Sequence, residues 1–315
     1  MNYKLSVVIP TYKRTKSLSR LLNLLKQQTI ADEIQVIIID QNKPGFLLSE
    51  IGESVLADVQ HIFQDEPNVS LARNCGVKHA LANYILFLDD DIIPDTDFCE
   101  KGMSILNENT HIKILSPTLL RKSQTAKEVL PKKVTENIYP LSSKDKYLHA
   151  TFFTISACTF YDKTEYFKTG GFDPYLFRFA KTNEDQEFFI RLMKNNFKVY
   201  LSANLQVVID EDMAGGCELR TAEYWISRRK NVRAMAYRLR IHNNIPGIFS
   251  LINLIQILRS FVINKKVLKS GVKNIIKEFK LMLSSIKESK VYFLNHYKNY
   301  ITAVDFLKEY KVDKI

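Results

Sequence analysis

The sequence predicts an α/β fold, in which an open, mostly parallel sheet is flanked by helices and followed by a basic helical C-terminal extension. Three short runs, at 5–10, 34–40 and 84–89, are almost continuously apolar and rich in β-branched and aromatic residues. Such runs are typical of strands covered on both faces, as in parallel sheets. Two segments with helical spacing lie between them, and the resulting β-α-β-α-β order indicates a doubly wound sheet.

The first helical segment, 17–28, reads SLSRLLNLLKQQ and precedes the second strand. Four leucines occupy one helical face of this segment: Leu18, Leu21, Leu22 and Leu25. This spacing is that of an amphipathic helix with one side on the core. The second segment, 70–82, reads SLARNCGVKHALA and leads into the third strand. We therefore expect a strand–helix unit to be repeated before the strand at 84–89.

The bulk composition favours a cytosolic globular protein. With 315 residues, 46% of them apolar, the chain can form one large domain with an appendage, or two domains. Its first residues run directly into the first strand pattern, without a basic and then apolar leader, so we expect a cytoplasmic location. Its four cysteines are scattered and form no Cys-x-x-Cys pair, which argues against a disulfide framework or a zinc site.

The positive charge lies in the C-terminal part of the chain. Residues 226–315 contain 19 Lys and Arg against 5 Asp and Glu, a balance of +14, whereas the whole chain carries +11. The first 225 residues are therefore slightly acidic. Such a basic segment suggests an anionic partner, either a membrane surface, a nucleic acid or a charged polymer, with a set of solvated helices as the simpler alternative.

Polar side chains collect where the predicted strands end. Thr11 and Tyr12 follow the first strand, Asp40 ends the second, and three consecutive aspartates, 89–91, end the third. In open parallel sheets, ligands bind beyond the carboxyl ends of the strands. A single acidic turn is common, but three adjacent carboxylates are costly unless a cation neutralises them. The convergence indicates a ligand site at this edge.

A divalent cation fits this edge better than a glycine-rich phosphate loop. The sequence contains neither G-x-G-x-x-G after the first strand nor G-x-x-x-x-G-K-[ST], which makes nicotinamide-cofactor and P-loop chemistry improbable. Asp89 and Asp91 are two positions apart and would point the same way. Carboxylates without nearby His or Cys favour Mg²⁺ or Mn²⁺ over Zn²⁺. We expect such a cation to hold a phosphate group.

Four ordered motifs carry a family resemblance: VVIPTYKR, VIIIDQN, SLARNCGVKHALANYILFLDDD and GGFDPYLFRFAKTNEDQEFFIRL. Over roughly residues 4–212 the chain resembles family 2 glycosyltransferases with the nucleotide-sugar-binding GT-A fold. The resemblance implies an inverting, metal-dependent transfer of a sugar from a nucleotide diphosphate, with UDP favoured, to an acceptor hydroxyl. It also implies a role in building a cell-surface polysaccharide or glycan, with a glycan or lipid-linked glycan as acceptor.

The resemblance assigns site residues as follows. The nucleotide-binding positions are Pro10, Thr11, Tyr12, Arg14, Asp40, Arg73, Asn74, Asp89 and Asp90. The metal ligands are Asp91, which is expected to bind directly, with Asp89 and Asp210. The acceptor-side positions are Gly170, Gly171, Phe172, Asp173 and Arg191. The catalytic pair is Asp185, as general base, with Glu184. The family often has a histidine ligand after the last core strand; here the segment reads QVVIDEDM, so Asp210 or Asp212 would take its place, or both are surface acids.

Asp185 is expected in the first turn of a helix. Thr182 or Asn183 can cap this helix, which continues through Phe188, Phe189 and Leu192. The positive end of the helix dipole favours the ionised carboxylate there. Ionisation suits a base that must be charged before the acceptor hydroxyl arrives.

We predict a catalytic domain at 1–225 and an extension at 226–315. The catalytic domain divides into a nucleotide-binding part, 1–115, and an acceptor part, 116–225, which includes a polar, lysine-rich insertion at 118–149. In the extension, 248–263 is too short and too polar to span a bilayer. An apolar stripe in it comprises Leu251, Ile255, Leu258 and Val262. This helix and the lysines after it suit the inner face of the cell membrane, or they pack on the catalytic body or on a second subunit.

Two other functions stay open at this point. A sugar-phosphate nucleotidyltransferase also uses an α/β sheet and acidic metal ligands, but it needs a glycine- and arginine-rich loop after the first strand, where PTYKRTKS has no glycine. A nucleic-acid-binding protein could act through the basic extension. That extension contains aromatic residues but no recognisable reading motif, so we expect no specific nucleic-acid partner.

Overall fold

The computed structural model describes residues 3–121, 148–151, 156–194, 197–210, 216, 224–242 and 271–296. The predicted apolar helix at 248–263, most of the insertion at 122–147 and Asp212 lie outside these residues. Three of the four cysteines, Cys75, Cys99 and Cys158, are buried free thiols, as expected. No helix within the described ranges is long and apolar enough to cross a membrane.

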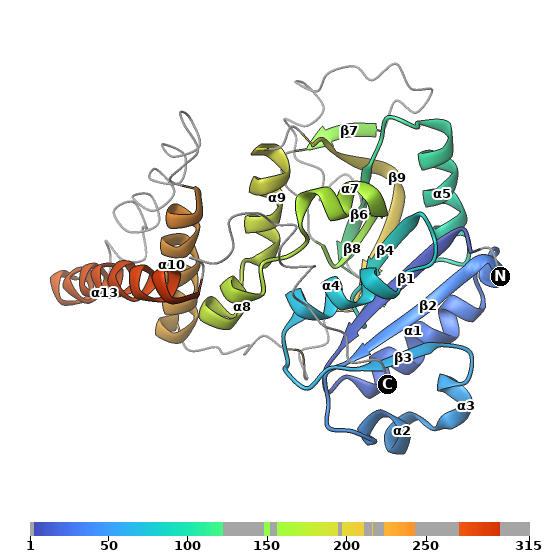
Figure 1. Cartoon of the computed structure of the whole chain (residues 1–315), viewed down its shortest axis with the longest axis horizontal. Coiled ribbons are helices and arrows are strands. Elements are labelled where there is room, and N and C mark those ends of the chain that lie inside the picture. Colours follow the sequence, from blue (N-terminus) through green and yellow to red (C-terminus); the bar gives the residue numbers. More distant parts are fainter. Residues whose placement is uncertain are drawn as a thin grey trace.

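The first half contains the predicted strand–helix–strand–helix–strand series, with further short elements between its second strand and its second helix (Figure 1). Its elements are β1 (Leu5–Thr11), α1 (Thr15–Lys26), a 3-10 turn (Ala31–Glu33), β2 (Ile34–Asp40), α2 (Phe46–Ile51), α3 (Glu53–Leu56), β3 (Gln60–Phe63), α4 (Val69–His79), β4 (Tyr84–Leu88), β5 (Ile92–Ile93) and α5 (Phe98–Glu108). The apolar runs form β1, β2 and β4, which confirms these three strands. The short strand β3 was not predicted, because its residues are polar or only half-buried.

The second half continues the same sheet and then leaves it. Its described elements are β6 (Ile114–Arg121), β7 (Leu148–Thr151), β8 (Cys158–Asp162), α7 (Lys163–Thr169), α8 (Pro174–Ala180), α9 (Glu184–Lys194), β9 (Val199–Ile209), α10 (Tyr224–His242) and α13 (Val272–His296). Both ends of the predicted insertion are strand residues, in β6 and β7, because they pair with β9.

The sheet has the order β3-β2-β1-β4-β8-β6-β9-β5, and β7 pairs with β9. All pairings among β1, β2, β3 and β4 are parallel, as predicted. Beyond β4 the sheet is mixed: β8 is antiparallel to both β4 and β6, whereas β6 and β9 are parallel. The parallel part brings the carboxyl ends of β1, β2 and β4 to one edge, and Thr11 is in register with Asp40.

Helices cover both faces of the sheet, which explains why the strands are almost continuously apolar. One core joins alternate residues of β1, such as Val7 and Ile9, to leucines of α1 and to α5. The other joins Val8 of β1 to α4, α7 and α9. Helices α10 and α13 pack on each other and reach the body through α8, where the rings of Phe179 and Tyr292 stack with centroids 4.8 Å apart. The described helices of the predicted extension thus contact the rest of the chain through α8.

Candidate active site

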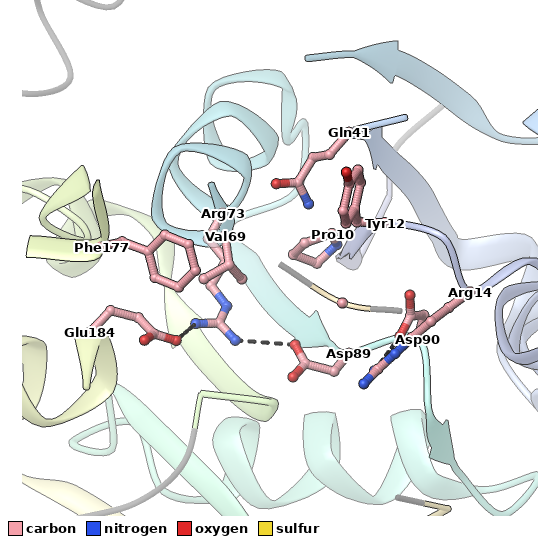
Figure 2. A pocket seen from close by; sticks show the side chains of 11 residues that line it. Pro10, Tyr12, Arg14, Gln41, Val69, Arg73, Asp89, Asp90, Phe177 and Glu184 are labelled. Carbon is pink, nitrogen blue, oxygen red and sulfur yellow. Dashed lines mark hydrogen bonds and ion pairs between the residues drawn. The ribbon is translucent and has the colours of Figure 1, made fainter. Parts of the chain in front are cut away.

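A pocket opens at the carboxyl ends of β1 and β4 (Figure 2). It has a volume of about 120 Å³. Its lining residues are Pro10, Tyr12, Arg14, Gln41, Val69, Arg73, Asp89, Asp90, Phe177, Glu184 and Gly216. They come from the loop after β1, the end of β2, helix α4, the turn after β4, and helices α8 and α9. The strand-end site predicted from the sequence is therefore a cavity in the structure.

Arg73 connects the two sides of this pocket. It lies on α4 and is 2% exposed. Its Nη2 donates to Asp89 Oδ1 at 3.1 Å, and its Nη1 lies 3.4 Å from Glu184 Oε1 and 3.3 Å from Asp185 Oδ1. Its guanidinium also lies over the ring of Phe172. Burial alone would lower the pKa of Arg73, but Asp89, Asp185 and Glu184 together raise it, so the side chain stays a cation.

Arg14 is a second buried cation of the site and pairs with two of the three consecutive aspartates. Its Nη1 donates to Asp90 Oδ1 at 2.9 Å and to Asp91 Oδ2 at 2.7 Å, and all three side chains are buried. Thr11 Oγ1 donates to the other oxygen of Asp90 at 2.8 Å. Burial raises the pKa of Asp90 to about 7, against the opposing effect of Arg14. Of the three consecutive aspartates, Asp89 has the accessible carboxylate, because its side chain is 32% exposed.

The carboxylates of Glu184 and Asp185 lie in the first turn of α9, as predicted. Burial raises the pKa of Asp185, and Arg73 opposes that rise. Burial also raises the pKa of Glu184, and the neighbouring Asp185 carboxylate adds to the effect. The helix dipole was expected to favour the ionised form of Asp185, but its pKa is raised instead, because removing the carboxylate from water disfavours the charged form.

Asp40 lies behind the pocket wall rather than on it. Its Oδ1 accepts hydrogen bonds from the backbone and side-chain nitrogens of Asn42, at 2.9 and 2.7 Å. Its Oδ2 lies 3.0 Å from Nε2 of His61, on β3. The adjacent residue Gln41 lines the pocket instead. The end of β2 is thus at the site, and the side chain that lines the pocket there is the amide of Gln41.

Structural contacts are made by Asn74, which was predicted to lie beside the nucleotide, and by Phe172 and Arg191, which were predicted for the acceptor side. The amide of Asn74 bonds both backbone groups of Phe172, with Nδ2 donating to O and Oδ1 accepting from N–H, each at 2.9 Å. Arg191 forms two hydrogen bonds with Glu187, at 2.9 and 2.7 Å, and one with the Thr169 carbonyl at 2.8 Å. None of these three residues is among those that line the pocket.

The other residues that were predicted for the acceptor side shape the loop between α7 and α8. Gly170 ends α7 in the left-handed conformation, with φ of 82°. Gly171 has φ of 70°, and a Cβ atom there would come within 2.4 Å of Asn74 Oδ1. Asp173 begins α8 and accepts hydrogen bonds from the N–H groups of Tyr175 and Leu176. The loop is therefore held by α4 and in turn holds α8, which carries Phe177 to the pocket.

The model of glycosyl transferase family 2 matches residues 6–169, just over half of the chain. This chain belongs to glycosyl transferase family 2. An uncharacterized glycosyltransferase of Haemophilus influenzae is 31% identical over 113 residues, 35% of this chain and 37% of its own length. The poly(ribitol-phosphate) β-N-acetylglucosaminyltransferase TarP of Staphylococcus aureus is 25% identical over 220 residues, 66% of this chain and 63% of its own length. The chain thus matches less than two thirds of these relatives.

Solved structures confirm the GT-A fold of this family 2 glycosyltransferase. S. aureus TarS 1–349 superposes with a TM-score of 0.57 at 18% identity, covering 99% of this chain and 93% of TarS 1–349. The same TarS fragment in complex with UDP gives 0.54 at 16% identity, covering 99% and 94%. A Pyrobaculum calidifontis mannosyltransferase in complex with GDP-Man and Mn²⁺ gives 0.57 at 12% identity, covering 98% and 79%.

A family 2 glycosyltransferase commonly uses a divalent metal, and the carboxylate of Asp89 fits one. It is a hard oxygen donor that faces the pocket beside Arg73. Asp91 is bound to Arg14, and Asp210 forms an ion pair with Arg20. Within the described ranges, no group of three His, Cys, Asp or Glu residues could hold a metal ion. Mg²⁺ and Mn²⁺ commonly complete their shell with water and phosphate oxygens, so a single protein carboxylate is compatible with such an ion.

Sequence reasoning missed four of the lining residues: Gln41, Val69, Phe177 and Gly216. Gln41 directly follows Asp40, and Val69 lies one turn before Arg73 on α4, so their positions carried a usable signal. Phe177 reads as an ordinary core residue of α8. Gly216 reaches the site because its N–H donates to the Tyr12 carbonyl at 2.8 Å, a contact that no sequence pattern announces.

Proposed function

We propose that this chain transfers a sugar from a nucleotide diphosphate, with UDP as the preferred nucleotide, to an acceptor hydroxyl with inversion at the sugar carbon. The acceptor would be a growing glycan or lipid-linked glycan in the synthesis of a cell-surface polysaccharide. The names of TarP and of the UDP complex of TarS support this choice of nucleotide and polymer.

One observation carries the proposal. Arg73 joins Asp89, on the strand-end side of the pocket, to the Glu184–Asp185 pair on the opposite side. A donor diphosphate at Asp89 and an acceptor at Asp185 would therefore approach the same cavity from two directions. Inversion requires this arrangement, because the acceptor must attack opposite to the departing nucleotide.

Each side chain has a proposed role that follows from its position. Tyr12 and Gln41 would contact the base of the donor. Asp185 would accept the proton of the acceptor hydroxyl while the acceptor oxygen bonds to the sugar carbon and the bond from that carbon to the diphosphate breaks. Because burial raises its pKa while Arg73 opposes the rise, Asp185 would be a stronger base than an ordinary carboxylate. Arg73 would hold Asp185 and Asp89 at a constant separation.

A divalent cation, Mn²⁺ or Mg²⁺, would be held by Asp89 together with phosphate oxygens of the donor, with Asp91 and Asp210 as the further predicted ligands. When bound, such an ion neutralises negative charge on the diphosphate leaving group.

A thermal-shift panel tests the proposal. Ligands that bind the native state raise the melting temperature. We expect UDP-sugars with Mn²⁺ to raise it more than GDP-, TDP- or CMP-sugars, and more than either component alone. A product assay then separates the two enzyme classes, since a glycosyltransferase releases a nucleoside diphosphate and a nucleotidyltransferase releases pyrophosphate. No response to any nucleotide sugar, together with salt-sensitive binding of nucleic acid, would contradict the proposal.

The proposal includes a location at an anionic membrane surface, supported by the outer face of α13. Apolar side chains at helical spacing are exposed there, among them Val272 (73%), Ile276 (51%), Phe279 (56%) and Leu283 (51%). Lysines at 273, 277 and 280 flank them. The opposite face is packed on α10 and includes the buried Glu278, which pairs with Arg228. An apolar face with flanking lysines is typical of helices that lie in a membrane interface.

Liposome flotation at rising salt tests this location. We expect recovery with anionic vesicles that falls as salt screens the lysines. A variant with Phe279→Ser and Leu283→Ser should lose recovery at every salt concentration. Equal recovery on neutral and anionic vesicles, or none, would point instead to packing or to association of two copies.

A further inference from the structure

We infer that helix α10, which belongs to the basic extension in sequence, positions the catalytic carboxylates through Asn231 and Tyr237. The inference rests on the proposed function, because it concerns the placement of Asp185. The two side chains contact the two ends of the α8–α9 segment, which runs from Asp173 to Asp185.

The first contact lies immediately before the carboxylate pair. Asn183 Nδ2 donates to Asn231 Oδ1 at 3.1 Å. Asn183 has φ of 66°, in the left-handed region, and its carbonyl accepts the Glu187 N–H at 3.2 Å. A left-handed residue other than glycine persists when its surroundings hold it. The bond to Asn231 therefore stabilises the backbone turn immediately before Glu184, which lines the pocket, and Asp185, which contacts Arg73.

The second contact lies at the start of α8. Tyr237 Oη donates to Asp173 Oδ2 at 2.9 Å, and both residues are buried. The other oxygen of Asp173 accepts the N–H groups of Tyr175 and Leu176 at 2.8 and 3.1 Å. One carboxylate thus caps α8 and ties it to α10, and α8 places Phe177 in the pocket wall beside Glu184.

An apolar contact lies between these two polar ones. Ala234 is three residues from both Asn231 and Tyr237, so the three share one face of α10. Ala234 is completely buried in a cluster with Leu176 and Ala180 of α8. Helix α10 consequently lies along α8 and touches the segment at its beginning, its middle and its end.

This arrangement predicts that a mutation in α10 changes turnover but not nucleotide affinity. The strand-end side of the pocket is formed by β1, β4 and α4, which α10 does not contact through these residues. Loss of the Asn231 or Tyr237 bond should therefore leave nucleotide affinity unchanged. It should loosen the first turn of α9 and move Asp185 out of hydrogen-bond reach of the acceptor hydroxyl for part of the time. Turnover would fall and the KM for the donor would stay the same.

The variants Asn231→Ala and Tyr237→Phe test the inference, with two controls. Asn231→Asp keeps an acceptor oxygen for Asn183, and Arg229→Gln changes a half-exposed residue of α10 that pairs only with α13 among the contacts described, through Glu288 at 3.3 Å. The first readout is amide hydrogen exchange of the peptide 181–189. A hydrogen bond contributes about 0.5–1.5 kcal/mol, so we expect roughly two- to tenfold faster exchange in Asn231→Ala and Tyr237→Phe, with little change in the controls or in the β1 peptide.

The second readout is turnover of the nucleotide sugar that raises the melting temperature most. We expect kcat to fall by roughly two- to tenfold in the same two variants, with unchanged donor KM and with rescue in Asn231→Asp. Unchanged exchange in the 181–189 peptide of both variants overturns the inference. Faster exchange with unchanged kcat overturns it as well, because α10 would then be only structural. If no nucleotide sugar binds or reacts in the wild type, the proposed function fails, and the exchange measurement still decides whether α10 holds this turn.

Discussion

Arg73 Nη1 lies 3.3 Å from Asp185 Oδ1, so a buried cation on α4 contacts the carboxylate in the first turn of α9 that we propose as the general base. The same guanidinium donates to Asp89 at the end of β4. Three segments that are distant in the sequence are joined by one side chain. The arrangement gives the pKa of Asp185 two opposing influences: burial raises it, and the neighbouring Arg73 cation opposes the rise.

Asp185→Asn should decrease sugar transfer by about 10²–10⁴-fold, the usual contribution of a general base. The affinity for UDP with Mn²⁺, measured by calorimetry, should stay within about twofold, because Asn keeps the size of the side chain. Glu184→Gln is the matched control, and its effect should be smaller. Wild-type turnover in Asp185→Asn, with an inactive Glu184→Gln, would move the role of the base to Glu184.

Asp89→Asn should abolish Mn²⁺-dependent UDP binding while leaving the melting temperature close to that of the wild type. Asp89 has the accessible carboxylate of the three, whereas Asp91 is bound to Arg14 at 2.7 Å. Asp91→Asn should instead lower stability, since removing one partner of a buried ion pair leaves charge uncompensated and costs up to roughly 3–5 kcal/mol. Asp90 still faces Arg14, so the cost should lie at the lower end. Normal stability with lost UDP binding in Asp91→Asn would make Asp91 the direct ligand, as the sequence predicted.

The sequence predicts those parts of the fold whose local pattern matches their final environment. Strands β1, β2 and β4 are almost continuously apolar because helices cover both of their faces. Strand β3 has two exposed residues and, among the described strands, pairs with β2 alone, so no apolar run marks it. The ends of β6 and β7 are strand residues only because β9 pairs with them, and β9 is distant in the chain.

The residues of the candidate site were also predictable only where the local pattern matches the final structure. The strand-end residues Tyr12 and Asp89 were predictable, because parallel strands present their carboxyl ends on one edge. A linear pattern does not contain the directions of side chains. It therefore could not predict that Asp40 bonds to Asn42 behind the pocket wall, or that Arg14 pairs with Asp91. The contact between Tyr237 and Asp173 joins residues 64 positions apart, and composition suggested a separate extension there.

The pH dependence of stability should change in Asp173→Asn. Burial raises the pKa of Asp173 to about 7, above its ordinary value of 3.8. The folded state therefore binds the proton more tightly than the unfolded state, and this group's contribution to stability is lost as the pH rises from about 4 through 7. The variant cannot lose a proton. Its melting temperature should fall below that of the wild type at pH 5 and approach or exceed it at pH 8, a relative change of several degrees. A constant difference across this range would contradict the buried, proton-binding carboxyl.

Gly171→Ala should destabilise the protein more than Gly45→Ala, although both glycines have a left-handed backbone. Gly45 has φ of 80° with nothing within 4 Å of an added Cβ, so its replacement should cost only about 1–2 kcal/mol for the conformation. At Gly171 the added Cβ would meet Asn74 Oδ1 at 2.4 Å. Asn74 cannot withdraw easily, because that oxygen accepts hydrogen bonds from the Phe172 N–H at 2.9 Å and the Tyr166 hydroxyl at 2.7 Å. We expect a further loss of roughly 1–3 kcal/mol, the cost of leaving buried polar groups unpaired. Urea unfolding of the two variants gives the comparison directly. Equal losses would mean that Asn74 adjusts without breaking these bonds, and that the loop before α8 is not held by it.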